Sequence, residues 1–229
     1  MKTQNESHSL MAIPDDVPNP SRRHFFQLSA GLAGVGVLIG ACHKSSSNNG
    51  VNLGSGDIGV LNYAYALEQL EAAFYTRVIA SQYSGITADE VALLTDIRDH
   101  EVAHREFFKA ALGTSAIQAL SVNFSSIDFS NRAAVLGAAK TFEDLGVSAY
   151  NGAGRLITSA EYLLVAGKIV SVEARHAAYI RDLIGYNSFA DNSAMGSNGL
   201  DLESSPNTVL AAASAYLNTK LDASNLPNN

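Results

Sequence analysis

The chain has 229 residues, of which 47% are hydrophobic and 16% charged, a composition typical of one globular domain with some non-globular chain. Its net charge of −7 argues against nucleic acid as a partner and gives no electrostatic attraction to anionic lipid. The single cysteine, Cys42, excludes an intrachain disulfide framework and a cluster of thiolate metal ligands.

The N-terminal segment has the organisation of an export signal. In "SRRHFFQLSAGLAGVGVLIGAC", Arg22 and Arg23 precede a Gly/Ala-rich apolar run that ends in small residues before Cys42. The stretch resembles a twin-arginine signal, whose motif opens with S-R-R-x-F-F, and "LIGAC" resembles a lipobox. The resemblance implies that residues 1–41 are the signal and that a lipid on the cysteine anchors the protein in the periplasm or cell envelope.

Two alternatives to lipidation stay open, namely cleavage without lipid and an uncleaved membrane anchor. The apolar run over 25–41 has 17 residues and includes Gln27 and Ser29, which makes it short and polar for a hydrocarbon core of about 30 Å. Residues 42–57 are rich in Ser, Asn and Gly, and we expect them to form a flexible tether. The globular domain is expected over 58–225.

The periodicity of the domain is helical throughout, and no strand pattern competes with it. Four long helices are expected at 60–82, 87–112, 131–157 and 158–185, with a short fifth helix at 208–221. Capping-box sequences open the second and fourth helices, at Thr87 with Glu90 and at Thr158 with Glu161. About 18 residues join the second helix to the third, enough to return along the bundle. The prediction is an all-α antiparallel four-helix bundle, with one long crossover between two hairpins.

Polar residues interrupt the apolar stripe of the second and fourth helices. Glu101 and His104, and likewise Glu173 and His176, occupy positions with the spacing of core-facing residues. In each Glu-x-x-His pair both side chains leave the same face one turn apart. One such pair alone is more often a solvated surface pair. Two pairs, one on the second helix of each hairpin, are a specific signal.

The first and third helices also match each other. "EQLEAAFY" at 68–75 aligns without a gap with "EDLGVSAY" at 143–150, which pairs Glu68 with Glu143 and Tyr75 with Tyr150. The two halves of the domain therefore form a weak internal repeat, each with Glu and Tyr on one helix and Glu-x-x-His on the next.

Four carboxylates that face one bundle core require compensation, because each costs several kcal/mol to desolvate and they repel one another. Two divalent cations would cancel the four charges, and two neutral imidazoles would complete the coordination. This donor set suits iron first, then manganese, and less often zinc. The alternative is that these are surface residues that happen to be in phase.

These segments resemble the ferritin-like superfamily, and particularly the bacterial ferritin-like domain family that includes plant desiccation-related proteins. The resembling stretches are "LEQLEAAFY", "DHEVAHREFFKAALG", "FEDLGVSAYNGA" and "SVEARHAAYIRDLIG". The resemblance implies a ferritin-like bundle with two half-sites and with Glu101 and Glu173 as bridging carboxylates. The implied ligands are Glu68, Glu101 and His104 in one half-site and Glu143, Glu173 and His176 in the other.

Several neighbouring residues have competing interpretations. Glu71 is an alternative ligand to Glu68, although the repeat aligns it with a glycine. Tyr75 and Tyr150 could donate hydrogen bonds to the ligands or relay radicals, but core tyrosines with a satisfied hydroxyl are commoner. His100 should lie off the ligand face, towards solvent.

The expected function is that of a dinuclear iron or manganese oxidoreductase at the cell envelope, with O2 or peroxide and Fe(II) as small substrates. A membrane contact is expected only through the lipid, and the number of subunits is left open. The competing hypothesis is a non-enzymatic stress or desiccation-related protein whose metal site is structural. A pure iron store is disfavoured because storage needs a cage of many subunits.

Overall fold

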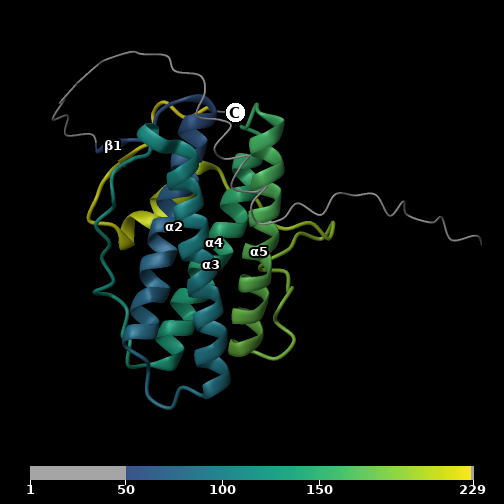
Figure 1. Ribbon diagram of the computed structural model, residues 1–229. Helices are drawn as coiled ribbons and strands as arrows, with labels where there is room; N and C mark the ends of the chain where they lie inside the picture. Colours follow the sequence, from purple (N-terminus) through teal and green to yellow (C-terminus); the bar gives the residue numbers. More distant parts are fainter. Residues whose placement is uncertain (1–49, 228–229) are drawn as a thin grey trace, which may run out of the picture. The chain divides into compact units, whose positions relative to one another are not determined.

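The computed structural model describes residues 50–227, and the predicted signal with Arg22, Arg23 and Cys42 lies outside them. Four long antiparallel helices dominate, as Figure 1 shows, and they confirm the all-α prediction. Their bounds are Gly56–Ala80 for α2, Ala88–Leu112 for α3, Arg132–Gly154 for α4 and Ala160–Ile184 for α5. Within this part of the chain, no helix combines the length and the hydropathy that a bilayer crossing requires.

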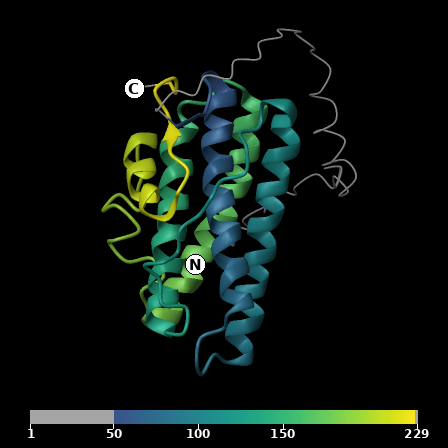
Figure 2. The ribbon, with the colours of Figure 1, turned by 90° about the vertical axis from the view of Figure 1, so that its left-hand side faces the viewer.

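The helices form two hairpins, because α2 packs mainly against α3 and α4 against α5, while α2 also contacts α4 across the bundle. The short helix η2 (Gly113–Ser115) follows α3, and the crossover then runs along the bundle to the start of α4 (Figure 2). This arrangement places the inward faces of all four helices around one core.

Side-chain caps mark the starts of α3, α4 and α5, and one of the predicted caps needs correction. Thr87 and Glu90 form the predicted capping box of α3. The cap of α5 is Ser159 rather than Thr158, so the predicted box of Thr158 and Glu161 is wrong. The Thr158 backbone N–H donates to Asp57 Oδ1 over 2.7 Å, and its hydroxyl donates to Asp57 Oδ2 over 2.9 Å. This carboxylate, from the first turn of α2, holds residue 158 outside the helix.

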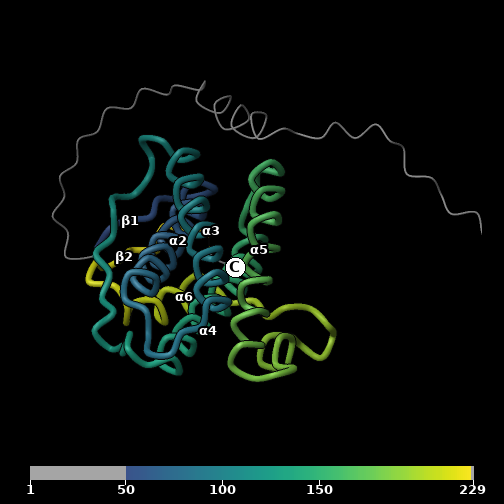
Figure 3. Tube along the Cα trace, turned by 60° about the horizontal axis from the view of Figure 1, so that its bottom comes forward, coloured from purple at the N-terminus to yellow at the C-terminus, as the bar shows by residue number. Residues whose placement is uncertain are grey.

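Residues 50–57 belong to the fold, which corrects this part of the predicted tether and the expected absence of strands, whereas residues 42–49 lie outside the described part of the chain. β1 (Val51–Asn52) pairs in parallel with β2 (Leu221–Asp222), and Figure 3 shows the two strands side by side. Leu53 follows β1 and is completely buried. A single large apolar side chain and a two-residue strand are enough to tie this segment to the C-terminal end.

The C-terminal segment docks on α4. The predicted fifth helix is shorter than expected, with α6 at Pro206–Ala213 and η3 at Ser214–Tyr216, and α6 lies beside α4 in Figure 2. The Ser204 backbone N–H donates to the Ser148 carbonyl over 2.9 Å. A Cβ atom at Gly152 would lie 1.9 Å from the Ser204 carbonyl oxygen. Only glycine therefore lets this segment approach α4 so closely.

Candidate metal centre

The six predicted ligands come together at the centre of the bundle, two from each of α3 and α5 and one from each of α2 and α4. All four carboxylates are completely buried and His176 is 5% exposed. The side chain of His104 is 14% exposed, so one edge of the centre approaches the surface. The set consists of Glu68, Glu101, His104, Glu143, Glu173 and His176.

One group of four residues surrounds His104. One donor atom each from Glu68, Glu101, His104 and Glu173 can be chosen so that all lie within 4.8 Å of one another. The Nδ1 atom of His104 lies 2.9 Å from Glu173 Oε1, 3.4 Å from Glu68 Oε2 and 3.8 Å from Glu101 Oε2. Nitrogen and oxygen donors therefore converge on one position.

The second group surrounds His176 in the same way. It consists of Glu101, Glu143, Glu173 and His176, again with donor atoms within 4.8 Å of one another. The Nδ1 atom of His176 lies 2.8 Å from Glu101 Oε1, 3.5 Å from Glu143 Oε2 and 3.7 Å from Glu173 Oε2. The internal repeat of the sequence is thus repeated in the geometry.

Glu101 and Glu173 belong to both groups, and each presents a different oxygen to each histidine. Glu101 directs Oε2 towards His104 and Oε1 towards His176. Glu173 directs Oε1 towards His104 and Oε2 towards His176. This is the geometry that two bridging carboxylates between two metal ions require.

Two buried tyrosines hold the remaining carboxylates from the opposite hairpin. The hydroxyl of Tyr75 on α2 donates to Glu143 Oε1, and the hydroxyl of Tyr150 on α4 donates to Glu68 Oε1. In each case the other oxygen, Oε2, has no hydrogen-bond partner among the described residues. The tyrosines are therefore both satisfied core residues and the groups that orient these two carboxylates.

The charges at the centre perturb one another strongly. Burial, together with the charge of Glu173, raises the pKa of Glu68 and of Glu101 above the usual range. Burial raises the pKa of Glu143 to about 7, although its interactions with His176 and Tyr75 act to lower this pKa. For His176 burial would lower the pKa, but the surrounding carboxylates prevail and raise it to about 12. Without a metal, protons bound to these carboxyl and imidazole groups must reduce the repulsion between the buried charges.

The donor set fits two metal ions better than it fits protons. The inward oxygens of the four carboxylates and the Nδ1 atoms of both imidazoles are buried and lie close together, but no contact between these atoms has the geometry of a hydrogen bond. Buried polar atoms are rarely left in this state without a ligand. Two divalent ions would cancel four carboxylate charges and leave both imidazoles neutral, as carboxylate–imidazole sites for iron or manganese require. Binding would release the protons that the cluster otherwise holds.

Glu71, the alternative ligand, belongs to neither group of donors. It is nevertheless 3% exposed, and its Oε2 atom has no hydrogen-bond partner in the described part of the chain. A Cβ atom at Gly146 would lie 3.0 Å from Glu71 Oε1 and 3.8 Å from Glu173 Oε2. The carboxyl group of Glu71 thus occupies the space that the glycine leaves at the matching position of the repeat, beside the centre.

His100 is a partner of the centre that the sequence analysis missed. Its ring is exposed, as expected, yet Nδ1 lies 2.9 Å from His176 Nε2 and the two rings stack at 5.2 Å. If His176 offers its Nδ1 atom to a metal, its Nε2–H group donates to His100, which fixes the tautomer and the ring orientation. The sequence signal was a third histidine four residues before His104.

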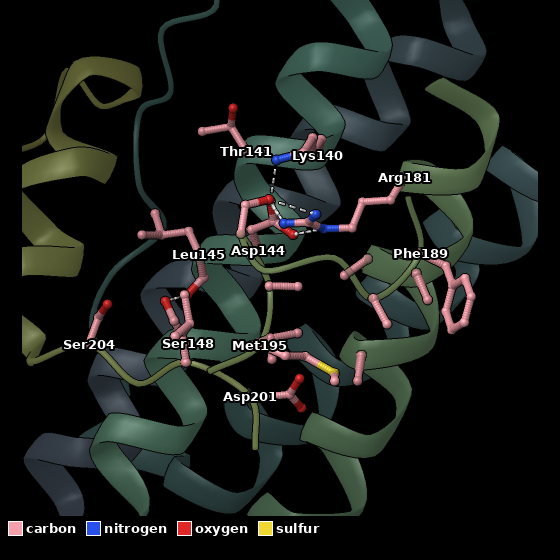
Figure 4. A pocket seen from close by; sticks show the side chains of 18 residues that line it. Lys140, Thr141, Asp144, Leu145, Ser148, Arg181, Phe189, Met195, Asp201 and Ser204 are labelled. Carbon is pink, nitrogen blue, oxygen red and sulfur yellow. Dashed lines mark hydrogen bonds and ion pairs between the residues drawn. The ribbon is translucent and has the colours of Figure 1, made fainter. Parts of the chain in front are cut away.

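A cavity of about 480 Å³ is lined by α4, α5 and the segment that follows α5. Figure 4 shows Arg181 reaching Asp144, which also binds Lys140. Arg181 is 1% exposed and also donates to Asp191 and Ser193 in the segment that follows α5. Both cations that line the cavity are already paired, so we interpret this cluster as a clamp for that segment.

Comparison with known proteins agrees with this geometry. A model of the ferritin-like domain matches residues 56–186, which is more than half of the chain and includes all six candidate ligands. No curated protein matches the sequence. The chain belongs to the ferritin-like domain family.

Proposed function

We propose that this protein is an exported, lipid-anchored ferritin-like oxidoreductase that holds two ions of iron, or otherwise manganese, and reacts with O2 or peroxide. The carrying observation is the pair of carboxylates, Glu101 and Glu173, that present one oxygen to each histidine. A structural zinc site is typically a single ion whose four positions are all filled by protein ligands. A shared pair of carboxylates supports two ions held close together, as redox chemistry on a two-electron substrate requires.

A pair of reduced iron ions supplies two electrons at one place. In the ferroxidase form of the reaction, O2 takes one electron from each of two Fe(II) ions and two protons from water, which leaves H2O2. In the peroxide form, H2O2 takes the same two electrons and two protons and leaves two molecules of water. Both balances need a site that binds two cations of the same kind.

The residues of the chain supply position and charge. Tyr75 and Tyr150 hold one oxygen of Glu143 and Glu68, so that the other oxygen faces the donor groups. The apolar surroundings of the centre limit the entry of water. The half-buried edge at His104 is the place where exchangeable ligands and protons can reach the centre.

The proposed location rests on the sequence around Arg22, Arg23 and Cys42. A twin-arginine signal would export the protein already folded, so the cytoplasm would choose the metal before export. The proposed role at the envelope is stress protection, through removal of Fe(II) or of peroxide.

Metal analysis of protein purified from its native host tests the proposal. We expect about two redox-active ions of iron or manganese per chain, and turnover of Fe(II) with O2 or of H2O2. Glu101→Gln should lose both metal and turnover, whereas Glu106→Gln, at an exposed position of the same helix, should keep both. Zinc, or metal without turnover, would instead support the structural, non-enzymatic function, and an unchanged metal content in the Glu101 variant would remove the ligand assignment.

A further inference from the structure

A small cavity lies inside the bundle on the side of the centre where Tyr150 is placed. Its volume is about 20 Å³, more than the roughly 10–15 Å³ that one water molecule needs, and a slightly larger apolar molecule requires only small movements of the wall. All four long helices contribute to its wall, and nearly all of the lining side chains are buried. The wall includes Tyr63, Leu67, Phe108, Ala149, Tyr150, Ala153 and Ala166.

The internal repeat explains why there is space here. The alignment that pairs the four carboxylates, the two histidines and the two tyrosines also pairs three alanines of this wall with larger side chains of the other half. These partners are completely buried. The pairs are Ala149 with Phe74, Ala153 with Val78 and Ala166 with Leu94. The three alanines leave space at these positions, while Tyr63 and Phe108 of the same wall are larger than their partners, Ala138 and Ile180.

The cavity shares a wall with the candidate centre. Tyr150 lines the cavity and donates its hydroxyl proton to Glu68, and Leu67, the residue before this glutamate, lines it as well. A molecule held in the cavity is thus separated from the centre by one layer of side chains. At the outer rim stand Ile157 and Ala166, both half-buried.

The wall offers almost nothing to a polar guest. Apart from Tyr63 and Tyr150, every lining side chain is aliphatic or phenyl, and the Tyr150 hydroxyl already donates to Glu68. The Tyr63 hydroxyl is buried without a hydrogen-bond partner among the described residues. A buried water usually makes about three hydrogen bonds, and apolar cavities stay dry and take up xenon. H2O2, with two hydroxyl groups, would lose more hydrogen bonds here than water does.

We propose that this cavity is an apolar holding site through which O2, rather than H2O2, reaches the dinuclear centre. The inference rests on the proposed function and names its oxidant. O2 is a small, apolar molecule that leaves no hydrogen bond unmade when it enters such a site. The half of the bundle that carries Ala149, Ala153 and Ala166 is accordingly the proposed entry side.

Xenon tests the cavity without any metal chemistry. Crystals of the metal-free protein, exposed to xenon gas, should show one xenon atom between Ala153 and Ala166. The double variant Ala153→Val, Ala166→Leu introduces the residue types that the other half has at these positions, and it should no longer bind xenon. The control variant Ala133→Val, Ala160→Leu makes the same changes at exposed positions of the same helices, and it should still bind xenon. An ordered water in the wild-type cavity, or no xenon there, would overturn the proposal.

Kinetics of the iron-loaded protein test the route. In the filled double variant, the O2 concentration for half-maximal Fe(II) oxidation should rise several-fold, while oxidation driven by H2O2 keeps its wild-type rate. An unchanged dependence on O2 would overturn the proposal. If the double variant does not fold by circular dichroism, Ala166→Leu alone, at the half-buried rim, gives the same comparison. If the wild type binds xenon but never consumes O2, delivery of O2 fails although the apolar cavity stands. The proposed function fails only if H2O2 is not turned over either.

Discussion

The substitution Glu71→Gln should stabilise the metal-free protein at neutral pH. Burial, followed by the charge of Glu173, raises the pKa of Glu71 well above its ordinary value of 4.5. The side chain has nearly the same shape after the change and stays in the space beside Gly146, so packing is preserved. What the substitution removes is an ionisable group that the folded protein holds in its neutral form.

The magnitude follows from the difference between the folded and the unfolded chain. Below about pH 4.5 the Glu71 carboxyl keeps its proton in both states, and the substitution should change little. As the pH rises further, the unfolded chain loses the proton while the folded protein keeps it, which lowers the free energy of unfolding by about 1.4 kcal/mol per pH unit. Between pH 5 and pH 7 the advantage of the variant should therefore grow by up to about 3 kcal/mol.

Urea unfolding after treatment with a chelator measures this effect, and far-UV circular dichroism is the suitable signal because the chain has no tryptophan. Glu106→Gln, at an exposed position, is the control and should show no such growth with pH. If the stability difference of Glu71→Gln is the same at pH 5 and pH 7, the folded protein keeps this carboxylate ionised and the reasoning is wrong. Loss of metal from the loaded variant would show instead that Glu71 is a ligand.

Three further changes probe the centre and its frame. His100→Ala should weaken metal binding about 10- to 100-fold in competition with a chelator, since His176 Nε2 loses its partner; unchanged affinity would make the contact incidental. Gly152→Ala should lower the free energy of unfolding by about 2 kcal/mol or more, because the new Cβ would meet the Ser204 carbonyl at 1.9 Å. Gly137→Ala, on the same helix with nothing within 4 Å, should raise it by about 0.5–1 kcal/mol, and equal effects of the two would refute the close approach. Chelation should lower the melting temperature in calorimetry and Fe(II) or Mn(II) should restore it, whereas an unchanged transition would mean that no metal stabilises the fold.

The bundle could be predicted from sequence because its signals are local. Helical periodicity and the Thr87 cap located α3, and the Glu-x-x-His pairs marked the faces that meet. The predicted start of α2 at Val60 lies four residues later than the Gly56 start in the structure. This helix is buried on almost every side between Gly59 and Ala72. An apolar stripe cannot show where such a helix begins.

The features that the sequence did not predict depend on contacts between distant parts of the chain. Thr158 and Ser159 are adjacent, and the hydroxyl group of either could cap α5. The Thr158 hydroxyl binds Asp57 instead, so Ser159 is the cap. The strands β1 and β2 have two residues each, too few to show a period, and they pair across the whole domain. The contact of His100 crosses from α3 to α5, which a helical wheel of one helix does not reveal.

The internal repeat suggests how one centre can hold two equal ligand sets and still treat its two sides differently. The donors of both half-sites are the same, so charge and coordination favour binding of two like ions. The surroundings break this symmetry, because His176 has His100 as a partner while Val172 stands at the matching position of the other half. The alignment "EQLEAAFY" with "EDLGVSAY" also sets Phe74 against Ala149, which lines the small cavity beside Tyr150. Symmetric ligands with an asymmetric shell are what a site needs to bind two identical metal ions and admit an oxidant from one direction.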